Sequence, residues 1–232
     1  MREITPAILE KDFGEIKNKL TFLRGRVKCA HIDIQDGTLT ENPTWPFASG
    51  GFEDADFIRI INEEEGMPYW DELDFDLDLM VSNAVENFAL YMKLGPKRII
   101  FHLMAQKNIE EFEEFLESLD MYTRDNVEIG LGFKPSDDLS VVSRLSHKVD
   151  FLHCMGSDRI GFQGEKFSDK ALENIKFLKK ELPGIVISVD IGINLDNAQN
   201  ILGAGVDRLS VGSSIWKSPD PIGALEDFQS LL

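Results

Sequence analysis

The sequence has few cysteines, and their spacing excludes both a disulfide framework and a structural zinc site. Only Cys29 and Cys154 occur among 232 residues, each inside an apolar run and without CxxC spacing. We therefore expect two buried thiols in a reducing compartment. Long hydrophobic runs are lacking too, since none approaches the roughly 18 residues of a membrane span and Pro6 precedes any stretch of signal-peptide length. These features predict a cytoplasmic protein with no membrane partner.

Positive charge is also scarce. The chain has 24 lysines and arginines against 41 aspartates and glutamates, which gives a formal net charge of -17. Such a surface repels polyanions, so we expect no nucleic acid partner. A small anionic substrate is not excluded, because backbone N–H groups at helix N-termini hold a phosphate locally whatever the overall charge.

Eight short apolar or β-branched runs alternate with segments of helical periodicity. The runs cover residues 4–9, 28–34, 75–81, 98–103, 127–133, 149–155, 185–191 and 208–211. Between them apolar residues recur at helical spacing, as Phe112, Leu116 and Leu119 do. Strict alternation predicts a parallel sheet, and eight units favour a closed (β/α)8 TIM barrel over an open sheet. No linker or low-complexity tract interrupts the chain, so we expect one domain over residues 1–232.

Residues typical of helix ends support these boundaries. Asn108 and Ser168 are N-cap candidates, while Gly95-Pro96 and Pro183-Gly184 would end helices before the next strand. A short helix is expected near residues 54–62, between irregular stretches that would form surface loops or a mobile flap.

Polar residues interrupt several strand runs near the C-terminal ends, where barrel enzymes carry their reactive groups. They are His31, Asp33, Asp76, Asp78, His102 and Asp190. His31 and Asp33 are two residues apart and so face the same side of one strand. Each residue alone is more often a structural group with satisfied hydrogen bonds. Several carboxylates converging in a barrel mouth instead indicate a divalent metal ion, because buried carboxylates without a cation are costly.

The donor types narrow the choice of metal. Imidazole and carboxylate ligands from different strands suit Zn, Mn, Fe or Co, and a carboxylate-rich set shifts the preference toward Mn or Mg.

Small residues follow strands six to eight, whose loops form the phosphate site of many barrels. They are Gly161, Gly164, Gly192, Gly212 and Ser213. A glycine allows the backbone N–H groups to approach an anion closely. Tight-turn geometry is the commoner reason for any single glycine, but their joint placement predicts a phosphate-binding site.

The segment from His31 to Gly37 resembles a family signature. Its sequence, His-Ile-Asp-Ile-Gln-Asp-Gly, is similar to the His-x-Asp-x-Met-Asp-Gly motif of ribulose-phosphate 3-epimerases and the related allulose-phosphate epimerases. Further segments resemble that family in the same order, namely residues 6–9, 76–81, 101–102, 130–135, 161–167, 189–193 and 211–216. The resemblance implies a ribulose-phosphate binding barrel. It also implies an isomerase of carbohydrate metabolism, such as the pentose phosphate pathway, acting on a phosphorylated sugar.

The resemblance also implies roles for individual residues. The metal ligands would be His31, Asp33, Asp78 and Asp190, with Asp33 and Asp190 as the proton-transferring acid and base. Met80 and Met155 would shield the intermediate. This set suits the chemistry, because inverting a carbon next to a ketone needs one base on each face of a planar ene-diolate and a cation at its oxygens.

Several positions depart from the family pattern. Asp78 replaces a histidine and Gln35 a shielding methionine, Ala7 removes a serine hydroxyl, and Gln163 and Ile191 replace phosphate-loop glycines. These departures leave the metal, the ketose phosphate and the activity itself open.

Two other interpretations therefore stand beside the epimerase. One is a different lyase or isomerase, in its Schiff-base form requiring a buried lysine such as Lys28 or Lys134. The other is a catalytically silent binding barrel. Neither the composition nor the motifs decide whether the protein is a monomer or a homo-oligomer.

Overall fold

A computed structural model describes residues 2–162 and 164–232, and its eight parallel strands form a closed barrel in chain order. The strands are β1 (Glu3–Ile8), β2 (Cys29–Gln35), β3 (Asp74–Met80), β4 (Arg98–His102), β5 (Glu128–Phe133), β6 (Phe151–Met155), β7 (Val186–Asp190) and β8 (Arg208–Val211). The predicted (β/α)8 fold class is thereby confirmed, and every predicted strand is present within about two residues of its expected bounds.

The contacts of the chain gather in two compact units. One unit is Ala7–Ile129, and the other contains the residues up to Pro6 together with Gly130–Leu232. The helices of the first are α1 (Phe13–Leu23), α2 (Ala55–Ile61), α3 (Phe88–Met92), α4 (Ile109–Ser118) and α5 (Met121–Asn126), with short 3-10 turns at Phe47–Ser49, Gly51–Glu53 and Leu103–Ala105. The helices of the second are α6 (Leu139–Leu145), α7 (Asp169–Glu181), α8 (Leu195–Gly203), α9 (Ser213–Trp216) and α10 (Pro221–Gln229), with a 3-10 turn at Ser146–Lys148.

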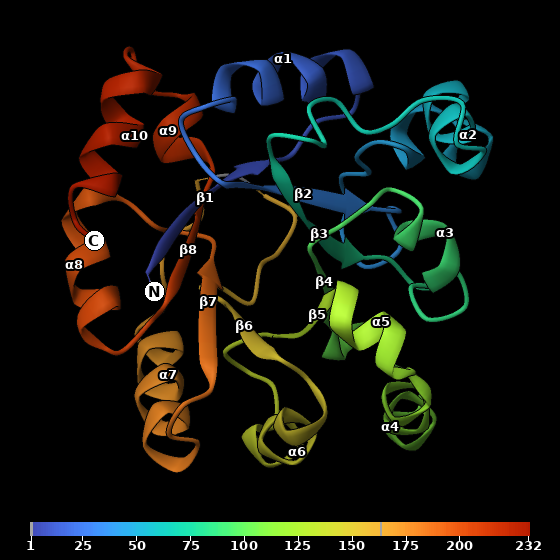
Figure 1. Cartoon of the computed structure of the whole chain (residues 1–232). Coiled ribbons are helices and arrows are strands. Elements are labelled where there is room, and N and C mark those ends of the chain that lie inside the picture. The colour runs from blue at the N-terminus through green and yellow to red at the C-terminus, as the bar shows by residue number, and fades with distance from the viewer. Residues whose placement is uncertain (1, 163) are drawn as a thin grey trace. The chain divides into compact units, whose positions relative to one another are not determined.

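Within the unit Ala7–Ile129, β2 and β3 run side by side over their whole length (Figure 1). Their register places His31 opposite Asp76 and Asp33 opposite Asp78. All seven residues of β2 are buried, as expected for a parallel strand covered on both faces. The register therefore brings together the polar side chains that the sequence places on two separate strands.

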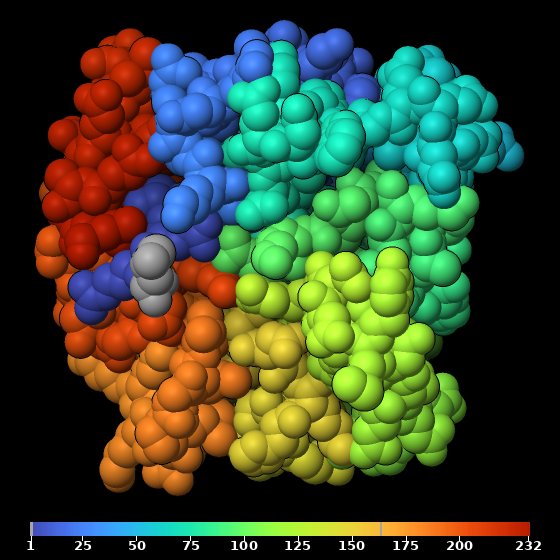
Figure 2. Space-filling view, viewed as in Figure 1, coloured from blue at the N-terminus to red at the C-terminus, as the bar shows by residue number. Residues whose placement is uncertain are grey.

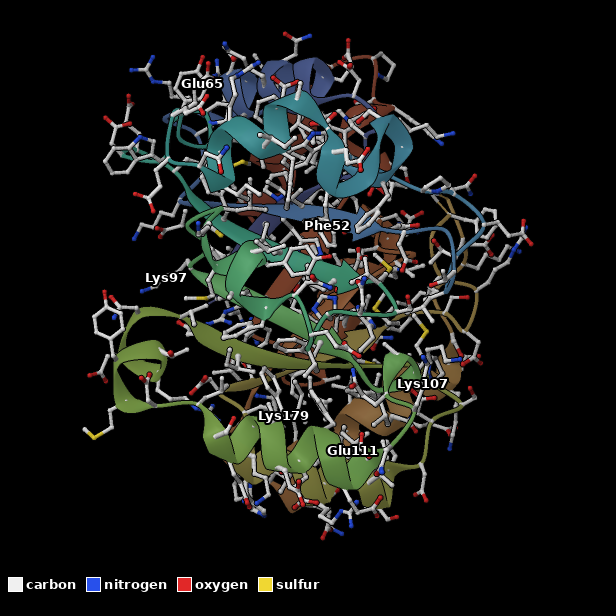
Figure 3. The ribbon with its side chains drawn as sticks, turned by 90° about the vertical axis from the view of Figure 1, so that its right-hand side faces the viewer. Phe52, Glu65, Lys97, Lys107, Glu111 and Lys179 are labelled. Atoms are coloured by element: carbon white, nitrogen blue, oxygen red, sulfur yellow. The ribbon has the colours of Figure 1, made fainter. Side chains whose placement is uncertain are left out.

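Side-chain caps fix the helix starts in this unit. Asn108 accepts hydrogen bonds from the backbone N–H groups of Glu110 and Glu111, as its predicted capping role requires. Figure 3 labels Lys107 and Glu111 at this end of α4. Asp54 caps α2 through the N–H of Phe57 and also accepts from Trp45 Nε1 at 3.0 Å. The predicted helix near residues 54–62 is confirmed, and its cap ties it to the loop that follows β2.

Aromatic rings pack beneath that loop. The ring of Phe52, labelled in Figure 3 beside α3, lies with its centroid 5.5 Å from that of Phe57 and 6.1 Å from that of Tyr91. Trp45 and Tyr91 are fully buried. Burial of rings of this size contributes a large share of the hydrophobic stabilisation and fixes the path of the chain leaving β2.

In the unit completed by Gly130–Leu232, β6, β7 and β8 lie side by side, with α7 and α8 outside them (Figure 1). Ser168 caps α7 by accepting from the N–H of Lys170, as predicted. The register pairs Met155 with Asp190 and His153 with Ser188. The C-terminal ends of β6 and β7 thus carry polar side chains at matching heights.

The surface of the unit Ala7–Ile129 includes the chain around α2, drawn in cyan in Figure 2. Trp70, in the segment between α2 and β3, is 70% exposed. None of the helices in the described part of the chain has the length and apolar character that a membrane crossing requires.

Candidate functional site

A buried group of histidine and aspartate side chains lies on β2 and β3. His31 Nε2 is 3.2 Å from Asp33 Oδ1 and 3.6 Å from Asp78 Oδ2. The other ring nitrogen, Nδ1, is 3.8 Å from Asp76 Oδ2. His31 and Asp78 have no exposed surface, and Asp33 is 6% exposed. One imidazole therefore stands among three buried carboxyl groups, which brings together the predicted residues His31, Asp33 and Asp78.

Side chains from β2 and β4 hold two of these carboxylates in place. Arg98 donates through Nε to Asp76 Oδ1, and the Cys29 thiol donates to the same oxygen at 3.1 Å. His102 Nε2 hydrogen-bonds with Asp78 Oδ1, which leaves Oδ2 as the oxygen nearer His31. Asp76 is thus paired with an arginine, whereas Asp78 lies between two imidazoles.

These contacts shift the pKa values of the group in different directions. Burial raises the pKa of Asp33, and the bond from His31 only partly offsets it. Burial would also raise the pKa of Asp76, but His31 and Arg98 outweigh it and the net pKa is lowered. For His31 burial would lower the pKa, yet its bonds to Asp33, Asp76 and Asp78 raise it well above the ordinary value. Asp33 is therefore a stronger base than a free aspartate.

The end of β2 is fixed by Thr44. Its hydroxyl donates to the carbonyl oxygen of Asp33 at 2.7 Å and accepts from the N–H of Gln35 at 2.9 Å. Gln35 is fully buried, and its register partner on β3 is Met80, which is also buried. The backbone that carries Asp33 is therefore held by hydrogen bonds just past the reactive side chain.

In the other unit, Asp190 ends β7 and is 8% exposed. His153 on β6 and Asp190 offer ligand atoms within 4.8 Å of each other, and His153 Nδ1 hydrogen-bonds with Ser188 Oγ at 2.6 Å. Met155, two residues after His153, is fully buried. The sequence reasoning missed His153, although the signal was the one used for the others, because a histidine interrupts the apolar run of β6.

Buried residues able to hold a metal ion are therefore present in both units. His31 and Asp78 are such residues in the unit Ala7–Ile129, where Asp33 lies beside them, and His153 and Asp190 are such residues in the other.

The predicted phosphate loops all belong to the second unit. Gly161, Gly164 and Gly192 have φ values of 80°, 85° and 77°, the region that favours glycine. A Cβ at Gly192 would lie 2.4 Å from the backbone nitrogen of Phe167, so this glycine is also required by the close approach of the chain between β6 and α7. Conformation and packing explain these glycines, and phosphate binding by them stays a prediction. Gln163 lies outside the described residues.

The loops after β7 and β8 are joined directly. Ser214 Oγ donates to the carbonyl oxygen of Ile193 at 2.6 Å. Gly212 is the N-cap of α9, so Ser213 stands in its first turn, where backbone N–H groups have no partner within the helix. Ile191 has φ 72°, a strained conformation for a β-branched residue at a position where the family pattern has glycine. The backbone geometry is thus retained here without the glycine.

The two lysines that a Schiff-base mechanism would need differ in position. Lys28 precedes β2 and is exposed, at the strand end opposite Asp33. Lys134 follows β5, is partly buried, and its backbone N–H donates to Asp137 at 2.8 Å. Lys28 therefore lacks the burial that lowers the pKa of a Schiff-base lysine.

Comparison with known proteins identifies relatives along nearly the whole chain. A model described as "Ribulose-phosphate 3 epimerase family" matches residues 3–216. Ribulose-phosphate 3-epimerase of Aquifex aeolicus is 25% identical over 237 residues, covering 100% of this chain and 97% of its own. The enzyme of that name from Bacillus subtilis is 24% identical and covers 99% of both chains.

Solved structures share the fold at lower identity. The 3-hexulose-6-phosphate synthase of Salmonella typhimurium superposes with a TM-score of 0.69 at 17% identity, over 99% of this chain and 98% of its own. KGPDC from Streptococcus mutans, in complex with ribose 5-phosphate, gives a TM-score of 0.70 at 14% identity, over 99% and 96%. At these identities the likeness concerns the barrel fold alone.

Proposed function

Because the chain belongs to the ribulose-phosphate 3-epimerase family, a family of isomerases, we propose that it is a metal-dependent epimerase acting on the carbon next to the ketone of a ketose phosphate. The substrate would be a phosphorylated sugar. We include in the proposal a cytoplasmic location and no nucleic acid or membrane partner. We leave open whether the enzyme works as a homo-oligomer.

The observation that carries the metal proposal is the buried group of His31, Asp33 and Asp78. Within the described residues Asp33 Oδ1 has no hydrogen-bond partner, and the adjacent group supplies only His31 between Asp33 and Asp78. Two buried carboxylates beside one imidazole suit a divalent cation, because desolvated negative charges need compensation. Asp190 would complete the set, and three carboxylates would favour Mn or Mg over Zn, Fe or Co.

When bound, such an ion stabilises negative charge on the substrate oxygens. The protein's own residues would then transfer the proton. Asp33, whose pKa is raised by burial, removes a proton from one face of the sugar carbon, and Asp190 returns one to the other face. Met80 and Met155 are fully buried near the ends of β3 and β6, which supports their roles in excluding water from the intermediate.

Phosphate would bind at the loops of the second unit. The carriers are the loop glycines Gly161, Gly164, Gly192 and Gly212 and the first turn of α9 at Ser213. The support is the direct bond between the loops after β7 and β8 and the backbone N–H groups at the start of α9.

The test uses Asp33→Asn and Asp190→Asn. With D-ribulose 5-phosphate and Mn²⁺ in D2O, wild-type protein should exchange the proton at C3, and each variant should lose roughly 100-fold or more of that exchange. Asp74→Asn is the matched control, because Asp74 is exposed at the other end of β3.

Exchange that persists in either variant would contradict the two-base mechanism. A wild-type protein without exchange on pentulose or hexulose phosphates would favour the silent binding barrel. Trapping of a covalent adduct by borohydride at Lys134 would favour the lyase.

A further inference from the structure

Gln35 occupies a place beside the reactive group that the proposed mechanism does not use. It is two residues after Asp33 and four after His31, so the three side chains share one face of β2. The register places it opposite Met80, two residues beyond the pair of Asp33 and Asp78. Gln35 has no exposed surface. A large polar amide is therefore buried at the C-terminal end of the strand that carries the proposed base.

One end of this amide is already engaged. The Thr40 hydroxyl donates to Gln35 Oε1 at 2.6 Å, and Thr40 itself is buried. This bond fixes the orientation of the amide and directs the Nε2 group away from Thr40. Within residues 2–162 and 164–232, Gln35 Nε2 has no hydrogen-bond partner. Buried amide N–H groups nearly always find an acceptor, so an unused donor at this place indicates a role beyond packing.

A buried amide with a purely structural role looks different in this protein. Asn174 on α7 is buried to the same extent, and its Nδ2 donates to the carbonyl oxygen of Pro135 at 3.0 Å. At Asn174 the amide N–H is used within the fold. At Gln35 the fold uses only the carbonyl oxygen and holds the N–H on the same strand face as Asp33.

We propose that Gln35 determines substrate specificity by donating a hydrogen bond from Nε2 to a hydroxyl oxygen of the sugar phosphate bound next to Asp33. This inference rests on the proposed function for the class of ligand. A site built to hydrogen-bond a hydroxyl discriminates against the analogue that lacks it, because the buried donor is then left unsatisfied. Gln35 thus selects polyhydroxylated ligands with an oxygen at this position.

Binding measured without chemistry gives the direct test. D-ribitol 5-phosphate has no ketone and does not react, so calorimetry on the Mn²⁺-loaded protein reports its affinity alone. Gln35→Met, which keeps an unbranched side chain of similar size but has no donor, should weaken binding roughly 3- to 10-fold. Gln35→Glu, which keeps the shape and loses the N–H donors, should weaken binding at least as much.

Deoxy analogues identify the acceptor. The 1-deoxy and 4-deoxy forms of D-ribitol 5-phosphate each lack one hydroxyl. For one of them, wild-type protein should lose as much affinity as Gln35→Met loses for the parent compound, and Gln35→Met should lose nothing further. Asn174→Leu serves as the control for a lost buried amide, expected to lower the thermal midpoint without changing affinity.

Three outcomes would overturn the inference. They are equal affinity of folded Gln35→Met and wild type for D-ribitol 5-phosphate, equal additional losses for both deoxy analogues in both proteins, and no binding to wild type. The epimerase assay is read separately. Turnover of D-ribulose 5-phosphate with Gln35-independent binding removes this inference and leaves the proposed function. Gln35-dependent binding without turnover does the reverse.

Discussion

At the scale of single residues, neighbouring aspartates on one strand face have different environments. Asp76 is paired with Arg98, which helps to lower its pKa and makes it a fixed anion. Asp78, two residues further along β3, is instead hydrogen-bonded by His102 and faces His31. A histidine that holds one carboxylate oxygen orients the other toward a ligand position, as outer-shell partners of metal sites do.

The first residue-scale prediction concerns His102. His102→Leu removes the hydrogen bond that orients Asp78 and should weaken Mn²⁺ binding roughly 10- to 100-fold. His102→Gln keeps an N–H donor near the same place and should retain most of the affinity. Metal affinity is measured by titration against a competing indicator, with the thermal midpoint as a check on folding. Equal Mn²⁺ affinity of His102→Leu and wild type would show that His102 does not support the site.

At the scale of elements, one carboxylate joins the chain leaving β2 to the chain leaving β3. Asp36 Oδ2 accepts from Ser82 N at 2.8 Å and Ser82 Oγ at 2.9 Å. Its other oxygen accepts from Thr38 N at 2.8 Å and Thr38 Oγ1 at 2.6 Å. Partial burial would raise the pKa of Asp36, but these four bonds outweigh it and lower the pKa below the ordinary value. The ionised carboxylate therefore stabilises the two strand ends that carry Asp33 and Asp78.

The corresponding prediction is a pH-dependent loss of stability in Asp36→Asn. A depressed folded-state pKa gives a contribution that is complete above the unfolded value of about 4 and is lost as pH falls through the folded value. The variant should lose about 1–2 kcal/mol in the free energy of unfolding at pH 7, and the difference should shrink below about pH 4. Urea denaturation at pH 7, 5 and 3 measures it, with the exposed Asp71→Asn as control. A difference of constant size across this range would mean that the carboxylate charge plays no part.

At the scale of the whole molecule, charge dominates the composition. A net charge of -17 makes the surface repel itself, and this repulsion opposes the compact state. The pairs among the described residues compensate only locally, as Arg24 and Glu72 do on the surface of the unit Ala7–Ile129. Exposed pairs of this kind contribute little to stability. The single-domain organisation of residues 1–232 stays a prediction at this scale.

The whole-molecule prediction is that salt stabilises the protein. Raising KCl from 20 to 300 mM at pH 7.5 shortens the Debye length from about 20 Å to below 10 Å and should raise the thermal midpoint by a few degrees. Repeating the scan near pH 5, where the net charge is much smaller, should reduce the effect. A midpoint that falls with salt at pH 7.5 would mean that attractive pairs outweigh the repulsion.

Much of the fold and part of the site could be predicted from the sequence. The alternation of eight apolar runs with helical segments requires parallel strands, because each strand must be followed by a crossover before the next. The period of two along β2 places His31, Asp33 and Gln35 on one face from their spacing alone. These properties are local, so they follow from the order of residues.

The partners of the buried polar groups were decided only by the tertiary structure. Nothing in the sequence pairs Arg98 with Asp76, His102 with Asp78 or His153 with Ser188, because each pair joins different strands and depends on their register. Two aspartates of the same strand face thereby become a neutralised anion and an oriented carboxylate. A shift of one residue in register would turn each side chain to the other face, which is why distant packing, and not local sequence, fixes the chemistry of the site.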